Sequence, residues 1–159
     1  MMIDEFLDWE KRQELRFEFD GFQPVPMTGE NEAHSTIQVN LICALGNRLE
    51  GTPCRVIGSD LKIRVGECIR YPDAFVLCGP VIPGRTVVRE PTVVLEIASG
   101  RTSYTDRFLK RTEYAATPSI RRYILLEQTG PAATAFERPD WIGRPIEGID
   151  AVLAMPEIG

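Results

Sequence analysis

Histidine is nearly absent from this chain of 159 residues, which contains only His34. No C-x-x-C pair occurs among the four cysteines, which are Cys43, Cys54, Cys68 and Cys78. Zinc sites are built from clusters of these two residue types at short spacings. We therefore expect no zinc site, four buried free thiols, and a histidine that satisfies a local hydrogen bond at the start of a helix.

The chain also lacks any apolar run near the ~20 residues that a membrane-spanning helix needs. Its first residues, MMIDE, are acidic and contain no apolar signal core. We therefore expect a cytoplasmic protein with no membrane partner. The motifs GxSxG, GxxxxGK[ST] and GxGxxG are missing as well, which argues against a serine hydrolase, a P-loop nucleotide-binding protein and a dinucleotide-binding protein.

Length and composition indicate an ordinary globular protein. The chain is 43% hydrophobic and 26% charged, and its length predicts one domain over residues 1–159. The net charge of −5 argues against generic nucleic-acid binding. However, residues 85–122 contain eight basic and four acidic residues. This region either binds a polyanion or forms a mixed, solvated surface.

The pattern of apolar residues predicts helices alternating with strands. Helical spacing is found over residues 3–15, 34–49 and 103–116, and strand patterns over 17–25, 61–65, 71–77, 92–98, 122–126 and 133–138. Gly66 and Glu67 predict a hairpin between two of these strands. The order of elements favours an α/β or α+β fold with a mixed central sheet flanked by helices.

Two acidic residues lie where strands are expected. Glu96 interrupts the apolar run 92–98, and a carboxylate at that depth is costly unless it is paired or binds a metal. Asp73 follows Pro72 at the start of another strand, on the same side as Phe75. The alternatives are an ion pair or a solvent-facing strand end for Glu96, and a turn residue for Asp73. Two acids on neighbouring strands would suit Mg²⁺ or Mn²⁺.

The helix predicted over residues 103–116 carries charged stripes. Asp106, Lys110 and Tyr114 are four residues apart and share one side, with Arg107 and Arg111 beside them. Ser103 with Asp106 fits a helix start. Lys110 is either a site residue or a solvated surface lysine. Glu18, just before a predicted bend, is either an additional acid for the same site or a surface carboxylate.

Taken together, these residues resemble the Uma2 family of restriction-endonuclease-like proteins, within the PD-(D/E)XK nuclease superfamily. The resemblance follows the family's order over nearly the whole chain. The matching stretches are 6–10 (FLDWE), 16–21 (RFEFDG), His34, 59–62 (SDLK), 71–73 (YPD), 91–99 (PTVVLEIAS), Asp106-Arg107-x-x-Lys110-x-x-x-Tyr114, and 122–126 (RYILL).

The resemblance implies a restriction-endonuclease-like core with a mixed sheet, and a magnesium-dependent site that cleaves phosphodiester bonds in DNA. It assigns Asp73 and Glu96 as catalytic residues and metal ligands. The superfamily usually places a lysine two residues after the second acid, where this chain has Ala98. The family instead has a lysine on the following helix, which corresponds to Lys110.

Two other functions stay open beside this one. The chain is alternatively an inactive nuclease-fold protein that binds nucleic acid, or an interaction module whose buried acids are structural. Arg107 and Arg111 are the expected phosphate-binding residues. Whether the protein forms a homodimer is left open.

Overall fold

The computed structural model describes the backbone of residues 1–99 and 104–159, and the side chains of residues 1–99 and 107–159. Its three helices are α1 (Ile3–Glu10), α2 (Glu32–Leu49) and α3 (Tyr104–Ala116). Its strands are β1 (Phe17–Phe19), β2 (Pro24–Pro26), β3 (Cys54–Gly58), β4 (Lys62–Val65), β5 (Cys68–Arg70), β6 (Ala74–Cys78), β7 (Val87–Val88), β8 (Val93–Ile97), β9 (Arg122–Leu126), β10 (Ala132–Glu137) and β11 (Arg144–Glu147).

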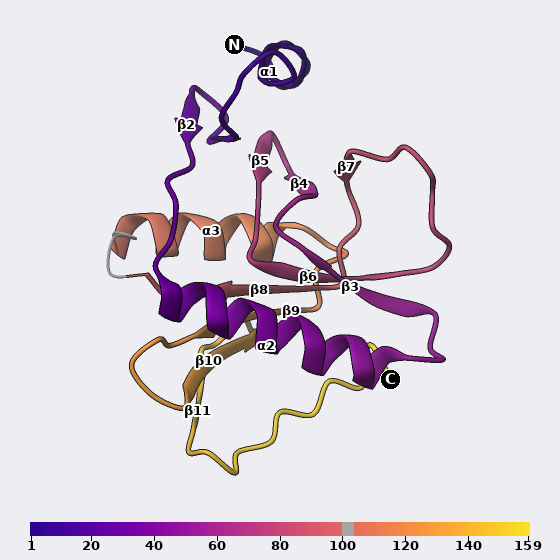
Figure 1. Cartoon of the computed structure of the whole chain (residues 1–159), viewed down its shortest axis with the longest axis vertical. Helices are drawn as coiled ribbons and strands as arrows, with labels where there is room; N and C mark the ends of the chain where they lie inside the picture. Colours follow the sequence, from indigo (N-terminus) through magenta and orange to yellow (C-terminus); the bar gives the residue numbers. More distant parts are fainter. Residues whose placement is uncertain (100–103) are drawn as a thin grey trace.

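The strands form a large and a small sheet (Figure 1). The large sheet has the order β11-β10-β9-β8-β6-β3, and the small sheet has the order β2-β1-β5-β4-β7. In the large sheet β8 pairs parallel with β9 and antiparallel with β6. The fold is therefore mixed α/β, as predicted, and its five-residue central strand β8 is buried along its whole length.

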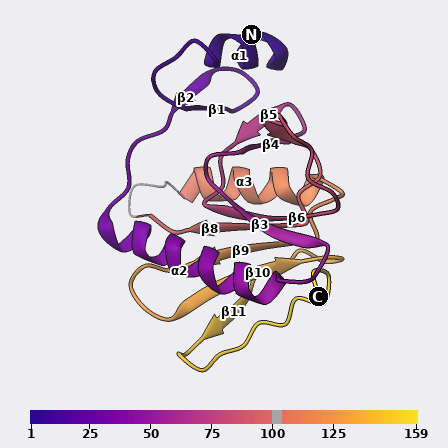
Figure 2. The same cartoon turned by 45° about the vertical axis from the view of Figure 1, so that its right-hand side comes forward.

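The two faces of the large sheet are covered by different elements. Figure 2 shows α3 between the two sheets and α2 on the opposite side of the large sheet. Alternation along β6 produces this division, because Phe75 and Leu77 pack with Tyr114 of α3, whereas Val76 packs with Leu45 of α2. Residues near the C-terminus, including Ile158, join the core on the α2 side.

A third core lies between α1 and the small sheet. Phe6 of α1 stacks on Phe19 of β1 at a ring distance of 4.9 Å, and Ile69 of β5 belongs to the same cluster. The Tyr71 hydroxyl donates a hydrogen bond of 2.7 Å to Glu10 at the end of α1. These contacts hold the N-terminal elements, including β1, against the rest of the small sheet.

The observed elements differ from the prediction mainly at short strands. The segment 17–25 is a hairpin of two three-residue strands, with Asp20 Oδ1 accepting hydrogen bonds from the backbone N–H groups of Phe22 and Gln23 at the turn. The hairpin at Gly66 is confirmed, but β4 pairs there with β5 rather than with one strand over 71–77. The strands β3, β5, β7 and β11 were not predicted, because each is short or lies at a sheet edge, where alternation is weak. Ser103 and the side chain of Asp106 lie outside the described part of the chain.

The expectation of four buried free thiols is wrong. Cys54 and Cys78 form a disulfide, and Cys43 is exposed. The disulfide follows from the register, because Cys54 of β3 lies directly opposite Cys78 of β6 in the antiparallel pair. Since β3 was not predicted, the sequence alone did not bring these two cysteines together.

None of the helices in the described part of the chain is both long enough and apolar enough to cross a bilayer.

Candidate functional site

A polar cavity of about 430 Å³ lies where the start of β6 meets the end of β8. Its lining includes the carboxylates Glu18, Asp73 and Glu96, together with Lys110 and His34. We call it the acidic cavity. Residues 25–28, which follow the β1–β2 turn, form another part of its wall. The structure therefore brings together Glu18, Asp73, Glu96 and Lys110, which were the candidates from the sequence.

Asp73 and Glu96 come from neighbouring antiparallel strands. Ala74 of β6 pairs with Leu95 of β8, so the residues one step further, Asp73 and Glu96, lie next to each other across the sheet. Both share the α3 face, since Asp73 alternates in step with Phe75 and Glu96 with Val94. The predicted placement of two acids on adjacent strands is thus confirmed.

The Asp73 carboxylate is held by groups from two other elements. Its Oδ2 atom accepts a hydrogen bond of 2.7 Å from the backbone N–H of Ile97 and lies 3.2 Å from His34 Nε2. Its side chain is 15% exposed. Asp73 is therefore a cavity residue bridging β8 and α2, and the turn-residue alternative does not describe it.

The Glu96 carboxylate lies at the end of β8 and contacts two residues of α3. Its Oε1 atom accepts a hydrogen bond of 2.8 Å from the Tyr114 hydroxyl and lies 3.4 Å from Lys110 Nζ. Glu96 is 9% exposed, so the solvent-facing alternative is wrong. The alternative of an ion pair describes part of what is seen, because Lys110 is its partner.

Lys110 lies between two carboxylates rather than in solvent. Its Nζ atom is 3.2 Å from Glu18 Oε1 as well as 3.4 Å from Glu96 Oε1. Only 14% of its side chain is exposed, which contradicts the solvated alternative. The reason is the orientation of α3, which turns Lys110 and Tyr114 inward while Phe108 and Leu109 face solvent, each 49% exposed.

Glu18 is buried and belongs to the same network. It accepts hydrogen bonds from the Tyr71 backbone N–H at 3.0 Å and from Arg70 Nη1 at 3.1 Å. Arg70 in turn makes a bidentate pair with Glu113 of α3, at 2.7 and 2.6 Å. The surface-carboxylate alternative for Glu18 is therefore wrong, and the network connects the small sheet to α3.

Burial and neighbouring charges shift the pKa values of the acids in the cavity, and not all in the same direction. The pKa of Glu96 is raised to about 7, because burial and the nearby carboxylates of Asp73 and Glu18 outweigh the lowering effect of Lys110. Burial also raises the pKa of Asp73, although the hydrogen bond from Ile97 opposes the change. Burial acts the same way on Glu18, but Lys110 and Arg70 outweigh it and hold that pKa below its ordinary value.

Three residues of the network were missed or misjudged in the sequence. The His34 imidazole contacts Asp73, whereas only its backbone N–H makes the expected local bond, to Asn31 Oδ1 at 2.9 Å. Arg70 had no signal, since it lies in an ordinary hairpin strand. Tyr114 could have been recognised from the sequence, because it follows Lys110 by one helical turn on the same side of the helix.

One of the two arginines expected to bind phosphates contacts a residue that lines the acidic cavity. Arg107 Nη2 donates a hydrogen bond of 3.1 Å to the carbonyl of Ser99, which lines that cavity. The Arg111 guanidinium lies 5.3 Å from the centre of the Phe136 ring. Both arginines line a separate hollow of about 190 Å³. The structure thus brings the two arginines together in one hollow, and Arg107 connects it to the acidic cavity through Ser99.

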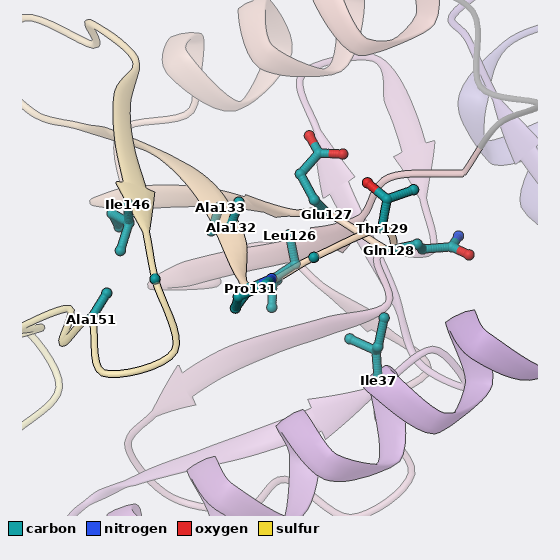
Figure 3. A pocket seen from close by; sticks show the side chains of 12 residues that line it. Ile37, Leu126, Glu127, Gln128, Thr129, Pro131, Ala132, Ala133, Ile146 and Ala151 are labelled. Carbon is teal, nitrogen blue, oxygen red and sulfur yellow. The ribbon is translucent and has the colours of Figure 1, made fainter.

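A larger hollow of about 550 Å³ lies elsewhere, around the β9–β10 turn (Figure 3). Figure 3 shows Ile37 of α2 on one side of it, with Pro131, Ile146 and Ala151 along the rest. Glu127 is the one ionisable side chain in the lining that the structure describes. Because an isolated acid offers no acid–base pair or ligand set, the acidic cavity is the better candidate site.

The donor set of the acidic cavity fits a hard cation. Within the described residues, no group of three or more His, Cys, Asp or Glu side chains is arranged to hold a metal ion. Mg²⁺, however, commonly uses one or two carboxylates and keeps several water molecules. Asp73 and Glu96 provide those two carboxylates on one cavity wall, so the residues present suit Mg²⁺ or Mn²⁺ rather than zinc.

The raised pKa of Glu96 predicts how stability changes with pH. Folded Glu96, with a pKa of about 7, binds its proton more tightly than the unfolded residue does at 4.5. The free energy of unfolding in EDTA should therefore fall as the pH rises from about 4.5 to about 7, by up to about 3 kcal/mol from this group. Urea denaturation across this range measures the effect.

Glu96→Gln mimics the protonated form and should remove this component, making the variant more stable than the wild type at pH 8 but not at pH 4. Asp73, whose pKa is also raised, contributes a slope of the same sign. Glu14→Gln, at an exposed glutamate, is the matched control. Identical pH profiles for the wild type and Glu96→Gln would contradict the prediction.

Comparison with known proteins finds the same kind of fold and family. A family model named Uma2, described as "Putative restriction endonuclease", matches residues 3–158. An uncharacterized protein of Synechocystis sp. is 33% identical over 140 residues, which is 86% of this chain and 74% of that protein. A crystal structure from Anabaena variabilis, described as "a putative nuclease belonging to DUF820", aligns with a TM-score of 0.84 and 17% identity, over 99% of this chain and 90% of that chain.

Proposed function

Because this chain belongs to the Uma2 family, whose model covers residues 3–158, we propose that it is a metal-dependent endonuclease that hydrolyses phosphodiester bonds in DNA. The observation that carries the proposal is the meeting of Asp73, Glu96 and Lys110 in one cavity. In metal-dependent phosphodiester hydrolysis, oxygen ligands hold a divalent cation, and a positive charge stabilises the reacting phosphate. The two carboxylates and Lys110 suit these two tasks. Mg²⁺ or Mn²⁺, DNA as substrate and a cytoplasmic location are parts of this proposal.

Each residue has a definite role in the proposed reaction. Asp73 and Glu96 would hold the divalent cation, which when bound supplies positive charge to the phosphate and lowers the pKa of a water molecule. Lys110 stabilises the negative charge that develops on the phosphate oxygens, or orients the attacking water. Glu18 holds the Lys110 ammonium group at 3.2 Å. Tyr114 fixes Glu96 through its 2.8 Å hydrogen bond.

Cleavage assays with and without a divalent cation test the proposal. Supercoiled plasmid, single-stranded DNA and RNA are incubated with Mg²⁺ or Mn²⁺, using the wild type and an Asp73→Asn, Glu96→Gln double variant. We expect cation-dependent nicking of DNA by the wild type and none by the double variant. Equal nicking by both proteins would contradict the proposal. Binding of nucleic acid without cleavage would support the inactive, nucleic-acid-binding alternative.

The arginine pair predicts how binding responds to salt. Replacing Arg107 and Arg111 together by alanine should weaken binding to all DNA sequences, because contacts to phosphates carry no sequence information. The slope of log affinity against log salt should decrease by about one for each lost phosphate contact. Fluorescence anisotropy over a salt series, using the catalytically blocked double variant as the background, measures this slope.

Arg12 and Arg48, both exposed and outside the basic region, form the control pair. Their joint replacement changes the net charge by the same amount and should leave the slope nearly unchanged. An unchanged slope in the Arg107 and Arg111 variant would show that these residues do not bind phosphates.

A further inference from the structure

The helix α2 holds Asp73 at two points. His34 Nε2 lies 3.2 Å from the side-chain oxygen Oδ2 of Asp73. Gln38 Nε2, one helical turn later, donates a hydrogen bond of 2.8 Å to the backbone carbonyl of the same residue. The side chain and the main chain of Asp73 are thus fixed by one face of one helix.

Both contacts come from a well-anchored part of α2. The helix begins after Asn31, whose side chain accepts a hydrogen bond of 2.9 Å from the His34 backbone N–H. Gln38 also donates to Ser59 Oγ at 3.2 Å, and His34 itself is only 4% exposed. The imidazole therefore has little freedom to leave Asp73.

The hydrogen bonds distinguish the two oxygens of the Asp73 carboxylate. Oδ2 accepts a hydrogen bond from the Ile97 backbone N–H at 2.7 Å and lies 3.2 Å from Nε2 of the His34 ring. For the ring to donate, Nε2 must carry the proton, and that nitrogen then has no lone pair for a metal ion. An oxygen that already accepts two hydrogen bonds is also the poorer ligand of the pair.

We propose that His34 is a positioning residue that locks the Asp73 carboxylate through Oδ2 and so presents Oδ1 to a divalent cation. This inference rests on the proposed function, since it assumes that Asp73 is a metal ligand. Outer-shell partners of metal-binding carboxylates and imidazoles usually matter for affinity by 10- to 100-fold, roughly. His34 acts through Asp73 and takes no direct part in the proposed reaction.

Calorimetric titration with Mn²⁺ and Mg²⁺ tests the assignment without relying on cleavage. His34→Ala should weaken binding by roughly 10- to 100-fold, and His34→Gln, which keeps an N–H donor, should recover part of the loss. In the Asp73→Asn background, His34→Ala should cause no further loss. Val39→Ala is the matched control, because Val39 lies on the same helix but is 58% exposed.

The chain has one histidine, so ¹⁵N NMR of the wild type reports the ring directly. We expect the proton on Nε2 in the metal-free protein. A proton on Nδ1 alone, or wild-type Mn²⁺ affinity in His34→Ala, would overturn the inference. Affinity that depends on His34 in a protein that cleaves nothing would support the inference while the proposed function fails. A wild type that binds neither cation would overturn both.

Discussion

Replacement of Lys110 by alanine is expected to lower the rate of DNA cleavage by roughly 10²–10³. The Lys110 ammonium group lies 3.4 Å from Glu96 and 3.2 Å from Glu18. A phosphate held beside the proposed metal ligands would therefore lie close to this positive charge. Its loss removes a fixed positive charge from a buried site, where water cannot replace it fully. Single-turnover cleavage of a labelled duplex with Mg²⁺ measures the rate.

Metal affinity, in contrast to the cleavage rate, should not fall in the same variant. Without Lys110, the two carboxylates lose a competing cation, so Mn²⁺ should bind as tightly as to the wild type or more tightly. Lys11→Ala is the matched control, because Lys11 is an exposed lysine that pairs with the exposed Asp8. A Lys110→Ala variant that cleaves at the wild-type rate would make this lysine a structural counter-ion and nothing more.

Replacement of Arg70 by alanine is expected to cost about 3–5 kcal/mol of unfolding free energy. Arg70 is 3% exposed and pairs with Glu18 at 3.1 Å and with Glu113 at 2.6 Å. Its removal leaves two largely buried carboxylates without their shared partner. Urea denaturation at pH 7 in EDTA, with circular dichroism as the signal, measures the loss.

Arg144 provides the matched control for this experiment. It also pairs with two acids, Asp140 and Glu137, but 47% of its side chain is exposed. Exposed pairs contribute little, so Arg144→Ala should cost less than about 1 kcal/mol. Adding Glu113→Gln to Arg70→Ala should recover part of the loss by removing one uncompensated charge. Equal losses for the two arginine variants would show that burial of the network does not matter.

The residues of the site that could be predicted are those that depart from the pattern expected for their strand or helix. Glu96 stood out because it interrupts an apolar strand, and Asp73 because it follows Pro72 at the start of another. Their meeting also followed from the pattern, since both were placed on strands of one sheet. Lys110 was found by its position on a helix face and by the resemblance to a family.

The other residues of the site take part through tertiary contacts, which produce no recognisable pattern in the sequence around them. The contact of His34 with Asp73 requires knowing how α2 crosses the sheet. The role of Arg70 requires the small sheet to pack against α3, and β5, which carries Arg70, was not predicted, because the expected strand began only at residue 71. The disulfide depends on the register of β3, an edge strand with no clear alternation.

The Glu18–Lys110 ion pair joins residues separated by 92 positions in the sequence. During synthesis Glu18, Asp73 and Glu96 emerge from the ribosome before Lys110, which lies between the first and the last of them. A nascent chain of that length contains Arg70, the partner of Glu18, but lacks Lys110, the partner of Glu96, so the cavity is completed only when α3 packs between the sheets. It follows that fragments ending before residue 110 contain the proposed metal ligands but cannot assemble the catalytic constellation.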